Sequence, residues 1–250
     1  MEIELEKKNI KFIKPMICFN VNEEKKVINK LELATYDNIK INKLLYQNDR
    51  FTKYDVNATV NGSIICVNPA LDEEIAECNS DSKEIEIESY NDYLKYYEKY
   101  SNTSDKKWIS NILSGDQDKD TVIYEDEHFI MLPDMKWTDN CLSNMYYLVI
   151  VKRKDLNSLR NLTGNDIELL EHILEKGLQT IESKHKIKKE KVRTYIHYRP
   201  SIWHLHIHFN HIDCINATCS IDFSHQLIYI IQNLKLDNTY YQKVDLKVLK

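Results

Sequence analysis

The sequence predicts an α+β fold: a C-terminal domain with an antiparallel sheet and flanking helices, and a smaller strand-rich N-terminal domain. Three observations predict it. The 250 residues, 42% of them hydrophobic and 29% charged, suffice for one large core or two small ones. The second half orders its patterns as hairpin, strand, helix and hairpin. An acidic stretch over residues 73–88 marks a change in composition between the two halves.

Residues 1–88 form the predicted N-terminal domain. Partial alternation over residues 10–20 and 26–35 predicts strands, and residues 62–69 predict a short buried strand that ends at a proline turn. Residues 89–107 are predicted as a hinge that contains a helix, because tyrosines recur there at helical spacing. We interpret this tyrosine stripe as a packing face rather than a ligand platform. It consists of Tyr90, Tyr93, Tyr97 and Tyr100.

Residues 108–250 form the predicted C-terminal domain. We expect a hairpin over residues 121–132 with a polar turn, and a buried strand over residues 145–151. Thr163, with Asp166 three residues later, resembles a capping box and opens a helix with an apolar stripe. The remaining expected elements are strands over residues 192–198 and 201–212, a helix over residues 224–234, and an alternating segment over residues 241–249.

Composition excludes several classes of protein. A formal charge of −5 and a pI near 6.0 argue against a general nucleic-acid coat protein. No apolar run approaches the ~20 residues that span a bilayer, and the first residues lack a signal-peptide pattern. We therefore expect a cytoplasmic or nuclear protein without membrane or DNA partners. The six cysteines are interpreted as reduced thiols, and a mixed Cys/His zinc site using Cys214 and Cys219 stays open.

The stretch Trp203–Phe209 carries three histidines that alternate with apolar residues. Successive side chains of a β-strand point to opposite faces, so His204, His206 and His208 would share one face, with the apolar residues against a core. A helix would scatter these imidazoles around its axis. The three residues are termed the histidine row. Imidazole can ligate a metal, or act as acid, base or nucleophile near neutral pH.

A metal site and a nucleophilic site make different demands on this row. A zinc ion needs each ligating imidazole nitrogen within ~2.1 Å. Alternate residues of a strand lie ~6.5–7 Å apart, so three imidazoles in a row on one strand reach a single ion poorly. Attack on phosphorus instead needs one imidazole that attacks, one that orients it and one that holds charge on the phosphate. His197, Ser201 and Lys136 could contact further phosphate oxygens. We predict a phosphohistidine intermediate without metal or cofactor, and a zinc site stays the alternative.

The pattern over residues 204–209 resembles the histidine triad superfamily of nucleotide hydrolases and transferases. Three further segments narrow the resemblance to the scavenger mRNA decapping enzyme family. They are residues 132–137, 158–163 and 195–201. The similarity extends from Trp108 to Leu234. It is faint over residues 1–88, where that family has a separate strand-rich domain that is exchanged between the subunits of a homodimer.

This resemblance implies hydrolysis of the residual mRNA cap, which is 7-methylguanosine joined through a triphosphate to a nucleotide or short oligonucleotide. The products would be 7-methylguanosine monophosphate and a nucleoside diphosphate. It implies that His206 is the nucleophile and that His204 orients it. The implied substrate contacts are His208, His197, Ser201 and Lys136 at the phosphates, Trp108 stacked on the methylated guanine, Asp134 and Met135 at the ribose and base, and Asp118 at the guanine edge.

Two positions depart from the family pattern. The family reads the guanine edge with an acidic residue, usually Glu, where this sequence offers Asp118, with Asp116 and Asp120 as competitors. An arginine that sometimes follows the histidine row is replaced by Phe223. Two alternative functions stay open. One is another histidine triad reaction, on dinucleoside polyphosphates or nucleoside phosphoramidates, and the other is a cap-binding protein without turnover.

Overall fold

The chain divides into two compact units between Lys83 and Glu84. The division precedes the predicted domain end at residue 88, because β7 (Ile85–Glu88) pairs with β14 (Leu246–Leu249) in the second unit. The predicted boundaries at residues 88 and 107 stay a prediction. The computed structural model describes residues 10–14, 17–22, 27–32, 40–47, 51–57, 62–67, 75, 84–100, 107–115, 119–137, 141–214 and 219–249.

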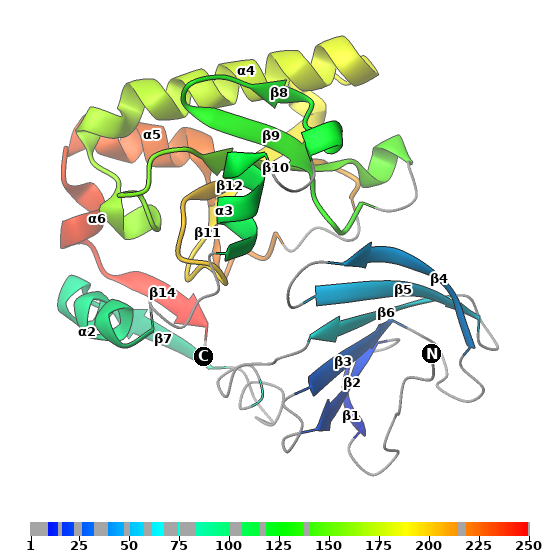
Figure 1. Ribbon diagram of the computed structural model, residues 1–250. Helices are drawn as coiled ribbons and strands as arrows, with labels where there is room; N and C mark the ends of the chain where they lie inside the picture. Colours follow the sequence, from blue (N-terminus) through cyan, green and yellow to red (C-terminus); the bar gives the residue numbers. More distant parts are fainter. Residues whose placement is uncertain are drawn as a thin grey trace. The chain divides into compact units, whose positions relative to one another are not determined.

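The first unit contains a six-stranded antiparallel sheet in the order β1-β2-β3-β6-β5-β4 (Figure 1). Its strands are β1 (Ile10–Lys14), β2 (Ile17–Asn22), β3 (Val27–Glu32), β4 (Lys40–Gln47), β5 (Phe51–Asn57) and β6 (Gly62–Val67). Strands were expected where β1, β2, β3 and β6 lie. The sequence did not predict β4 and β5, because two register shifts between them break the period of two that marks a strand.

The second unit contains a six-stranded antiparallel sheet in the order β13-β11-β12-β10-β9-β8, which confirms the α+β class. Its strands are β8 (Tyr124–Glu125), β9 (Phe129–Pro133), β10 (Tyr146–Val151), β11 (Val192–His197), β12 (His206–His211) and β13 (Ser224–Gln226). Its helices are α2 (Tyr90–Tyr100), α3 (Lys107–Ser114), α4 (Ile167–His185), α5 (Leu227–Leu236) and α6 (Tyr240–Lys243). None of the helices described is long and apolar enough to cross a membrane.

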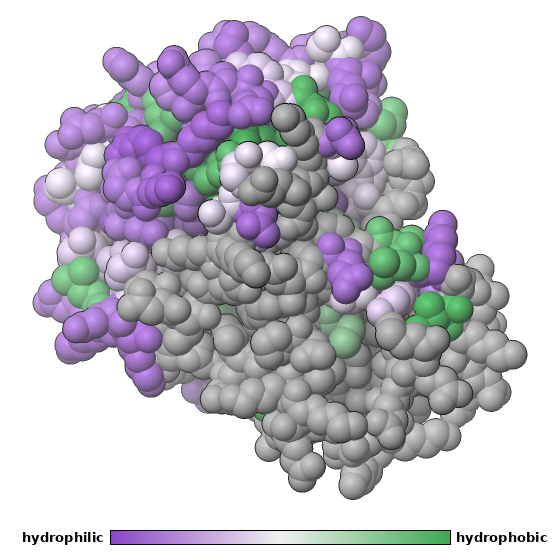
Figure 2. All heavy atoms as spheres, in the orientation of Figure 1, coloured by the Kyte–Doolittle hydropathy of each residue, from purple (hydrophilic) through white to green (hydrophobic). Residues whose placement is uncertain are grey.

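Helices α4 and α5 cover one face of this sheet (Figure 1). Ile207 and Phe209 of β12 pack there against buried residues of α4 such as Ile173. Gly177 allows α4 to lie close to β12, because a Cβ at that position would lie 2.6 Å from the Phe209 ring. The outer side of α4 carries exposed polar and charged residues, and Figure 2 shows hydrophilic side chains over it. The apolar residues of the histidine row therefore face a core, as expected.

Helix α3 packs on the opposite face of the sheet. Ile109 and Ile112 of α3 form a second buried cluster with Ile130 and Leu132 of β9 and with two residues of β10, Leu148 and Ile150. Trp108 lies against the same cluster. The histidines of β12 share this face, because Ile150 pairs with His206 and Leu148 with His208 in the ladder.

Several predicted elements of the second unit are confirmed. Within the tyrosine stripe of α2, Tyr93 and Tyr97 form the predicted packing face, since Tyr93 is 2% exposed and the ring of Tyr97 lies 5.1 Å from that of Trp203. The side chain of Tyr100 lies outside the described residues. Thr163 and Asp166 form the predicted capping box, with Thr163 N–H donating to Asp166 Oδ2 over 2.8 Å. That box closes a short 3-10 turn, after which α4 begins at Ile167.

Other predicted elements are wrong in part. The strand expected over residues 201–212 begins only at His206, because residues 201–204 form bends that follow Pro200. The alternating segment over residues 241–249 consists of α6 followed by β14. The helix expected from residue 224 begins at Leu227, after the short strand β13.

Arg160 lies at the centre of a buried polar network and is 0% exposed. Its Nη1 donates to the carbonyls of Tyr241 and Val244 over 2.8 and 2.6 Å. Its Nη2 donates to the carbonyl of Glu88 over 2.7 Å and to Glu88 Oε1 over 3.2 Å. One guanidinium therefore joins β7, the turn that contains Arg160, and the end of α6.

The Glu88 carboxylate extends this network to the end of β11. Tyr198 donates its hydroxyl to Glu88 Oε1, and Arg199 Nε donates to Glu88 Oε2 over 2.8 Å. The Arg199 guanidinium lies 3.7 Å from the centre of the Tyr96 ring. The network thus fixes the turn that leads from β11 into the histidine row.

Candidate active site

His206 begins β12 and is half-buried. Its Nδ1 lies 2.8 Å from the main-chain carbonyl of His204, and because a carbonyl can only accept, Nδ1 carries the proton and donates. A neutral imidazole has a single N–H, so Nε2 carries a lone pair. Burial lowers the pKa of His206, and the hydrogen bond to His204 raises it in part. His206 is therefore neutral near pH 7, with Nε2 available as a nucleophile.

His204 lies just before β12 and is 5% exposed. Its Nε2 donates to the carbonyl of Val151, at the end of β10, over 2.6 Å. The side chain therefore anchors the residue to the neighbouring strand. The main-chain carbonyl of His204 is the group that bonds the His206 ring, and the predicted role of His204 in orienting His206 stays a prediction.

His208 is 5% exposed and bonded to a tyrosine. Its Nδ1 lies 3.0 Å from the hydroxyl of Tyr146, and that hydroxyl lies 3.1 Å from the hydroxyl of Tyr195. Its Nε2 is buried and has no hydrogen-bond partner among the residues described. Burial holds the pKa of His208 well below its ordinary value, with His197, His206 and Lys136 lowering it further. His208 is therefore neutral, and Nε2 is available to a ligand.

His197 joins this group from β11. Its ring centre lies 4.3 Å from that of His208 and 5.1 Å from that of Phe223. The predicted proximity of His197 to the histidine row is thus present in the structure. Phe223 precedes β13, which pairs with β11 on the edge away from β12, and it stands at the position where the family sometimes has arginine.

The turn after β9 brings Lys136 and Asp134 to the same place. Asp134 Oδ1 accepts the N–H of Lys136 over 2.8 Å, and Trp137 N–H donates to the Asp134 carbonyl over 2.9 Å, which closes the turn. Lys136 Nζ lies 5.4 Å from the centre of the Tyr146 ring. The charge of Lys136 lowers the pKa of His206, and Asp134 raises that pKa. Met135 lies half-buried in the same turn.

The remaining predicted site residues are less closely tied to the histidine row. Trp108 is half-buried on the face that carries His206 and His208, and its Nε1 is buried without a hydrogen-bond partner among the residues described. Ser201 is exposed in the bends before the row. Asp120 is exposed in a short 3-10 turn. Asp116 and Asp118 lie outside the described residues.

Tyr146 and Tyr195 were not among the site residues predicted from the sequence. Both are buried, with exposed fractions of 0% and 2%. Tyr146 opens the run YYLVIV, which reads as a wholly apolar strand and gives no polar signal. Tyr195 pairs with His208 across the β11–β12 ladder, so its place two residues before His197 was the one available signal.

Among the residues described, no set of side chains matches the alternative zinc site. No three His, Cys, Asp or Glu side chains of the described part of the chain are grouped so that they could hold a metal ion. Cys214 is buried and donates to the carbonyl of Asn144, and Cys219 accepts from Arg193.

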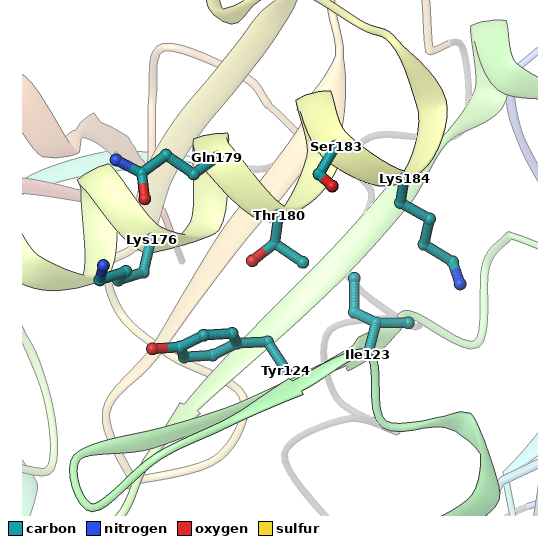
Figure 3. Close-up of a pocket in the computed structure, with 7 residues that line it drawn as sticks. All are labelled: Ile123, Tyr124, Lys176, Gln179, Thr180, Ser183 and Lys184. Carbon is teal, nitrogen blue, oxygen red and sulfur yellow. The ribbon is translucent and has the colours of Figure 1, made fainter.

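A separate pocket of about 430 Å³ lies between α4 and the residues at the start of β8 (Figure 3). It is on the face of the sheet opposite the histidine row, because α4 covers that face. The seven residues that line it include neither histidine nor carboxylate. They are Ile123, Tyr124, Lys176, Gln179, Thr180, Ser183 and Lys184. This pocket is therefore not the candidate active site.

Comparison with known proteins gives the family. Residues 107–221 match the family model described as "Scavenger mRNA decapping enzyme C-term binding". The m7GpppX diphosphatase of Ascaris suum is 34% identical over 218 residues, which cover 80% of this chain and 70% of that protein. Its counterpart in Caenorhabditis elegans is 32% identical over 234 residues, which cover 89% of this chain and 73% of that protein.

Solved structures are also similar to part of the chain. A structure described as "Hnt3 in complex with DNA and guanosine" covers 54% of this chain and 80% of its own, at 16% identity and a TM-score of 0.36. The two diphosphatases have higher sequence identity to this chain than that structure has, and their similarity extends over both halves of the chain. Together with the family model, they confirm the resemblance that the histidine row and its neighbouring segments indicated, and the chain belongs to the m7GpppX diphosphatase family of scavenger mRNA decapping enzymes.

Proposed function

We propose that this protein hydrolyses a 7-methylguanosine cap dinucleotide or a short capped oligonucleotide. The observation that carries the proposal is the hydrogen bond from His206 Nδ1 to the carbonyl of His204, which leaves Nε2 unprotonated. Two further observations support it. His208 Nε2 is buried without a partner among the residues described, and Lys136 adds positive charge at the same site. The relatives are named m7GpppX diphosphatase.

The proposed reaction has two steps on one phosphorus atom. His206 Nε2 attacks the phosphorus next to 7-methylguanosine, and the bond from that phosphorus to the bridging oxygen breaks. The bridging oxygen keeps the electron pair and leaves as the end of a nucleoside diphosphate. Water then attacks the same phosphorus, the N–P electron pair returns to Nε2, and a water proton passes to solvent. The released product is 7-methylguanosine monophosphate.

The hydrogen bond to the His204 carbonyl also serves the intermediate. When Nε2 binds phosphorus, the imidazole ring becomes positively charged, and the proton on Nδ1 becomes a stronger donor. The carbonyl lies 2.8 Å away before the reaction begins, so it stabilises that charge without rearrangement.

The substrate contacts remain a proposal. We assign His208, His197, Ser201 and Lys136 to the phosphates. Trp108 is assigned to the methylated guanine, because a cationic purine stacked on tryptophan gains up to ~2 kcal/mol when it is desolvated. Asp134 and Met135 are assigned to the ribose and base, and Asp118 to the guanine edge.

Subunit arrangement and cellular location belong to the same proposal. We expect a homodimer in which the N-terminal unit is exchanged between subunits, and a cytoplasmic or nuclear location where capped fragments arise. Light scattering of the purified full chain tests the dimer, since a monomeric mass would contradict it. Imaging of the tagged full chain in cells tests the location, since accumulation in any other compartment would contradict it.

Product analysis in water enriched in heavy oxygen tests the reaction directly. With a methylated cap dinucleotide, the label should enter 7-methylguanosine monophosphate and not the nucleoside diphosphate. Label in the diphosphate would move the attack to another phosphorus. Equal turnover of methylated and unmethylated dinucleotides would contradict a methylguanine pocket, and no turnover would refute the function.

Substitution of the nucleophile separates catalysis from binding. His206→Asn should abolish hydrolysis, a loss of about 10⁴-fold or more, while the cap dinucleotide still binds. His211→Asn, which changes a histidine at the other end of β12, should keep full activity. Activity should also persist in excess chelator. Full activity in His206→Asn would remove the nucleophile assignment, and loss in chelator with recovery on zinc would overturn the phosphohistidine route.

A further inference from the structure

A chain of two buried tyrosines leads to the imidazole of His208. Tyr195 Oη lies 3.1 Å from Tyr146 Oη, which lies 3.0 Å from His208 Nδ1. The ring of Tyr195 also stacks on that of His208, with centres 5.1 Å apart and planes inclined by 16°. Both tyrosines and His208 are at most 5% exposed. Water therefore competes little for these hydrogen bonds.

The direction of these hydrogen bonds can be inferred from Tyr195, the residue farthest from His208 in the series. Among the residues described, Tyr146 is the one hydrogen-bond partner of the Tyr195 hydroxyl. Burial raises the pKa of Tyr195 well above its ordinary value, so the hydroxyl keeps its proton. A buried hydroxyl proton needs an acceptor, and the oxygen of Tyr146 is the acceptor at hand. Tyr195 therefore donates to Tyr146, and His208 Nδ1, which lies 3.0 Å from the same hydroxyl, is placed to accept the proton of Tyr146.

The tautomer of His208 is fixed by the same logic. His208 is neutral, so it carries one proton on either Nδ1 or Nε2. A proton on Nδ1 would meet the proton of Tyr146, so Nδ1 accepts and the proton resides on Nε2. That nitrogen is buried without a partner among the residues described. An orphaned buried donor on the face that carries His206 is suited to an anionic oxygen.

We propose that Tyr195 and Tyr146 are positioning residues that hold His208 in the tautomer whose Nε2–H donates to a phosphate oxygen of the substrate. His206 and His208 thus carry opposite tautomers. In His206 the carbonyl of His204 draws the proton to Nδ1, which frees Nε2 to attack. In His208 the tyrosine pair directs the proton to Nε2, which becomes a donor. One strand therefore presents a nucleophile and a hydrogen-bond donor side by side.

This inference rests on the proposed function for its phosphate, and its first test needs no substrate. Nitrogen-15 spectra of labelled histidine in the full chain report which ring nitrogen carries the proton, and His208→Gln assigns the signal. We expect a protonated Nε2 in the wild type. In Tyr195→Phe the oxygen of Tyr146 loses the hydrogen bond from Tyr195 and can accept from Nδ1–H instead, so a mixture with the Nδ1–H tautomer should appear. Protonated Nδ1 in the wild type, or an unchanged tautomer in Tyr195→Phe, would overturn the proposal.

Kinetics with the methylated cap dinucleotide give the second readout. Tyr195→Phe should lower kcat about 5-fold, as expected for the loss of one net hydrogen bond, with KM changed by less than about 2-fold because the donor acts on the developing charge. Tyr147→Phe is the matched control. Tyr147 is as buried as Tyr195 and follows Tyr146 in β10. Its hydroxyl lies 2.7 Å from Nε2 of His185, on the face of the sheet opposite His208. It should alter neither the tautomer nor kcat.

The outcomes separate the two proposals. If the wild type does not hydrolyse the cap but shows the protonated Nε2 and the shift in Tyr195→Phe, the proposed function fails and the tautomer assignment stands. If the cap is hydrolysed and Tyr147→Phe lowers kcat as much as Tyr195→Phe does, the effect is structural and the positioning role is refuted.

Discussion

Replacing Arg160 with methionine would remove a buried guanidinium and leave the backbone carbonyls of Glu88, Tyr241 and Val244 without their donor. Each buried carbonyl that loses its donor costs about 1 kcal/mol or more. The Glu88 carboxylate keeps Arg199 as a counter-charge, so the charge is not left alone. We therefore expect the free energy of unfolding to fall by about 3–5 kcal/mol, the upper value being that of a broken buried ion pair.

Urea unfolding followed by circular dichroism measures this loss. The control is Lys235→Met, because Lys235 Nζ lies 2.5 Å from Glu171 Oε1 but the two side chains are 54% and 48% exposed. That pair should contribute less than about 1 kcal/mol. Arg160→Lys should fall between, since an ammonium keeps the charge but lacks the planar fork. A loss below about 1 kcal/mol in Arg160→Met, or equal losses in the two methionine variants, would refute the reasoning.

Two further predictions concern packing and pH. Gly177→Ala places a carbon 2.6 Å from the Phe209 ring, so urea unfolding should show a loss of about 1–3 kcal/mol, and unchanged stability would contradict the close packing of α4. Because burial lowers the pKa of His208 in the folded chain, the unfolded chain binds more protons below pH ~6.5, and stability falls as the pH falls. The Tm of His208→Gln should therefore fall less than that of the wild type when the pH is lowered from about 7.5 to 5.5. An equal fall in Tm would contradict the lowered pKa of His208.

The parts of the fold that could be predicted are those with a regular period or a local signal. The six buried residues of β10 form a continuous apolar run, and α4 combines a capping box with an apolar stripe. The alternation in Ile207 and Phe209 correctly placed the face of the sheet that α4 covers. Each of these signals lies within a single element, so it can be read without knowledge of its neighbours.

The parts that could not be predicted depend on contacts between distant elements. His204 was expected in the strand, but its imidazole bonds the carbonyl of Val151 and the chain bends before β12 begins. Tyr146 and Tyr195 are 49 positions apart, and only the pairing of β10 and β11 with β12 brings their hydroxyls together. The spacing in the sequence predicted the histidines of the site, whereas the groups bonded to their Nδ1 atoms could be identified only in the tertiary structure.

Phe223 offers a test of how the site holds phosphate. Its ring lies 5.1 Å from that of His197, just before β13, which pairs with β11 on the edge away from β12, and the family sometimes has arginine at this position. Phe223→Arg would place a planar cation next to a residue assigned to the phosphates. A charged hydrogen bond to phosphate contributes about 1.5–3 kcal/mol, and exposure to solvent reduces that value. We therefore expect KM for the cap dinucleotide to fall about 3- to 10-fold at low salt.

The salt dependence identifies the cause of that gain. An electrostatic contact should weaken as salt is raised from about 0.05 to 0.5 M, because the Debye length shortens, so the variant and the wild type should converge in KM. Phe223→Leu keeps an apolar side chain against His197 and should leave KM unchanged. The same fall in KM in Phe223→Leu would assign the effect to lost bulk instead. An unchanged or higher KM in a folded Phe223→Arg variant would show that the phosphates do not reach this side of His197, and their assigned contacts would then be confined to the side of His208 and Lys136.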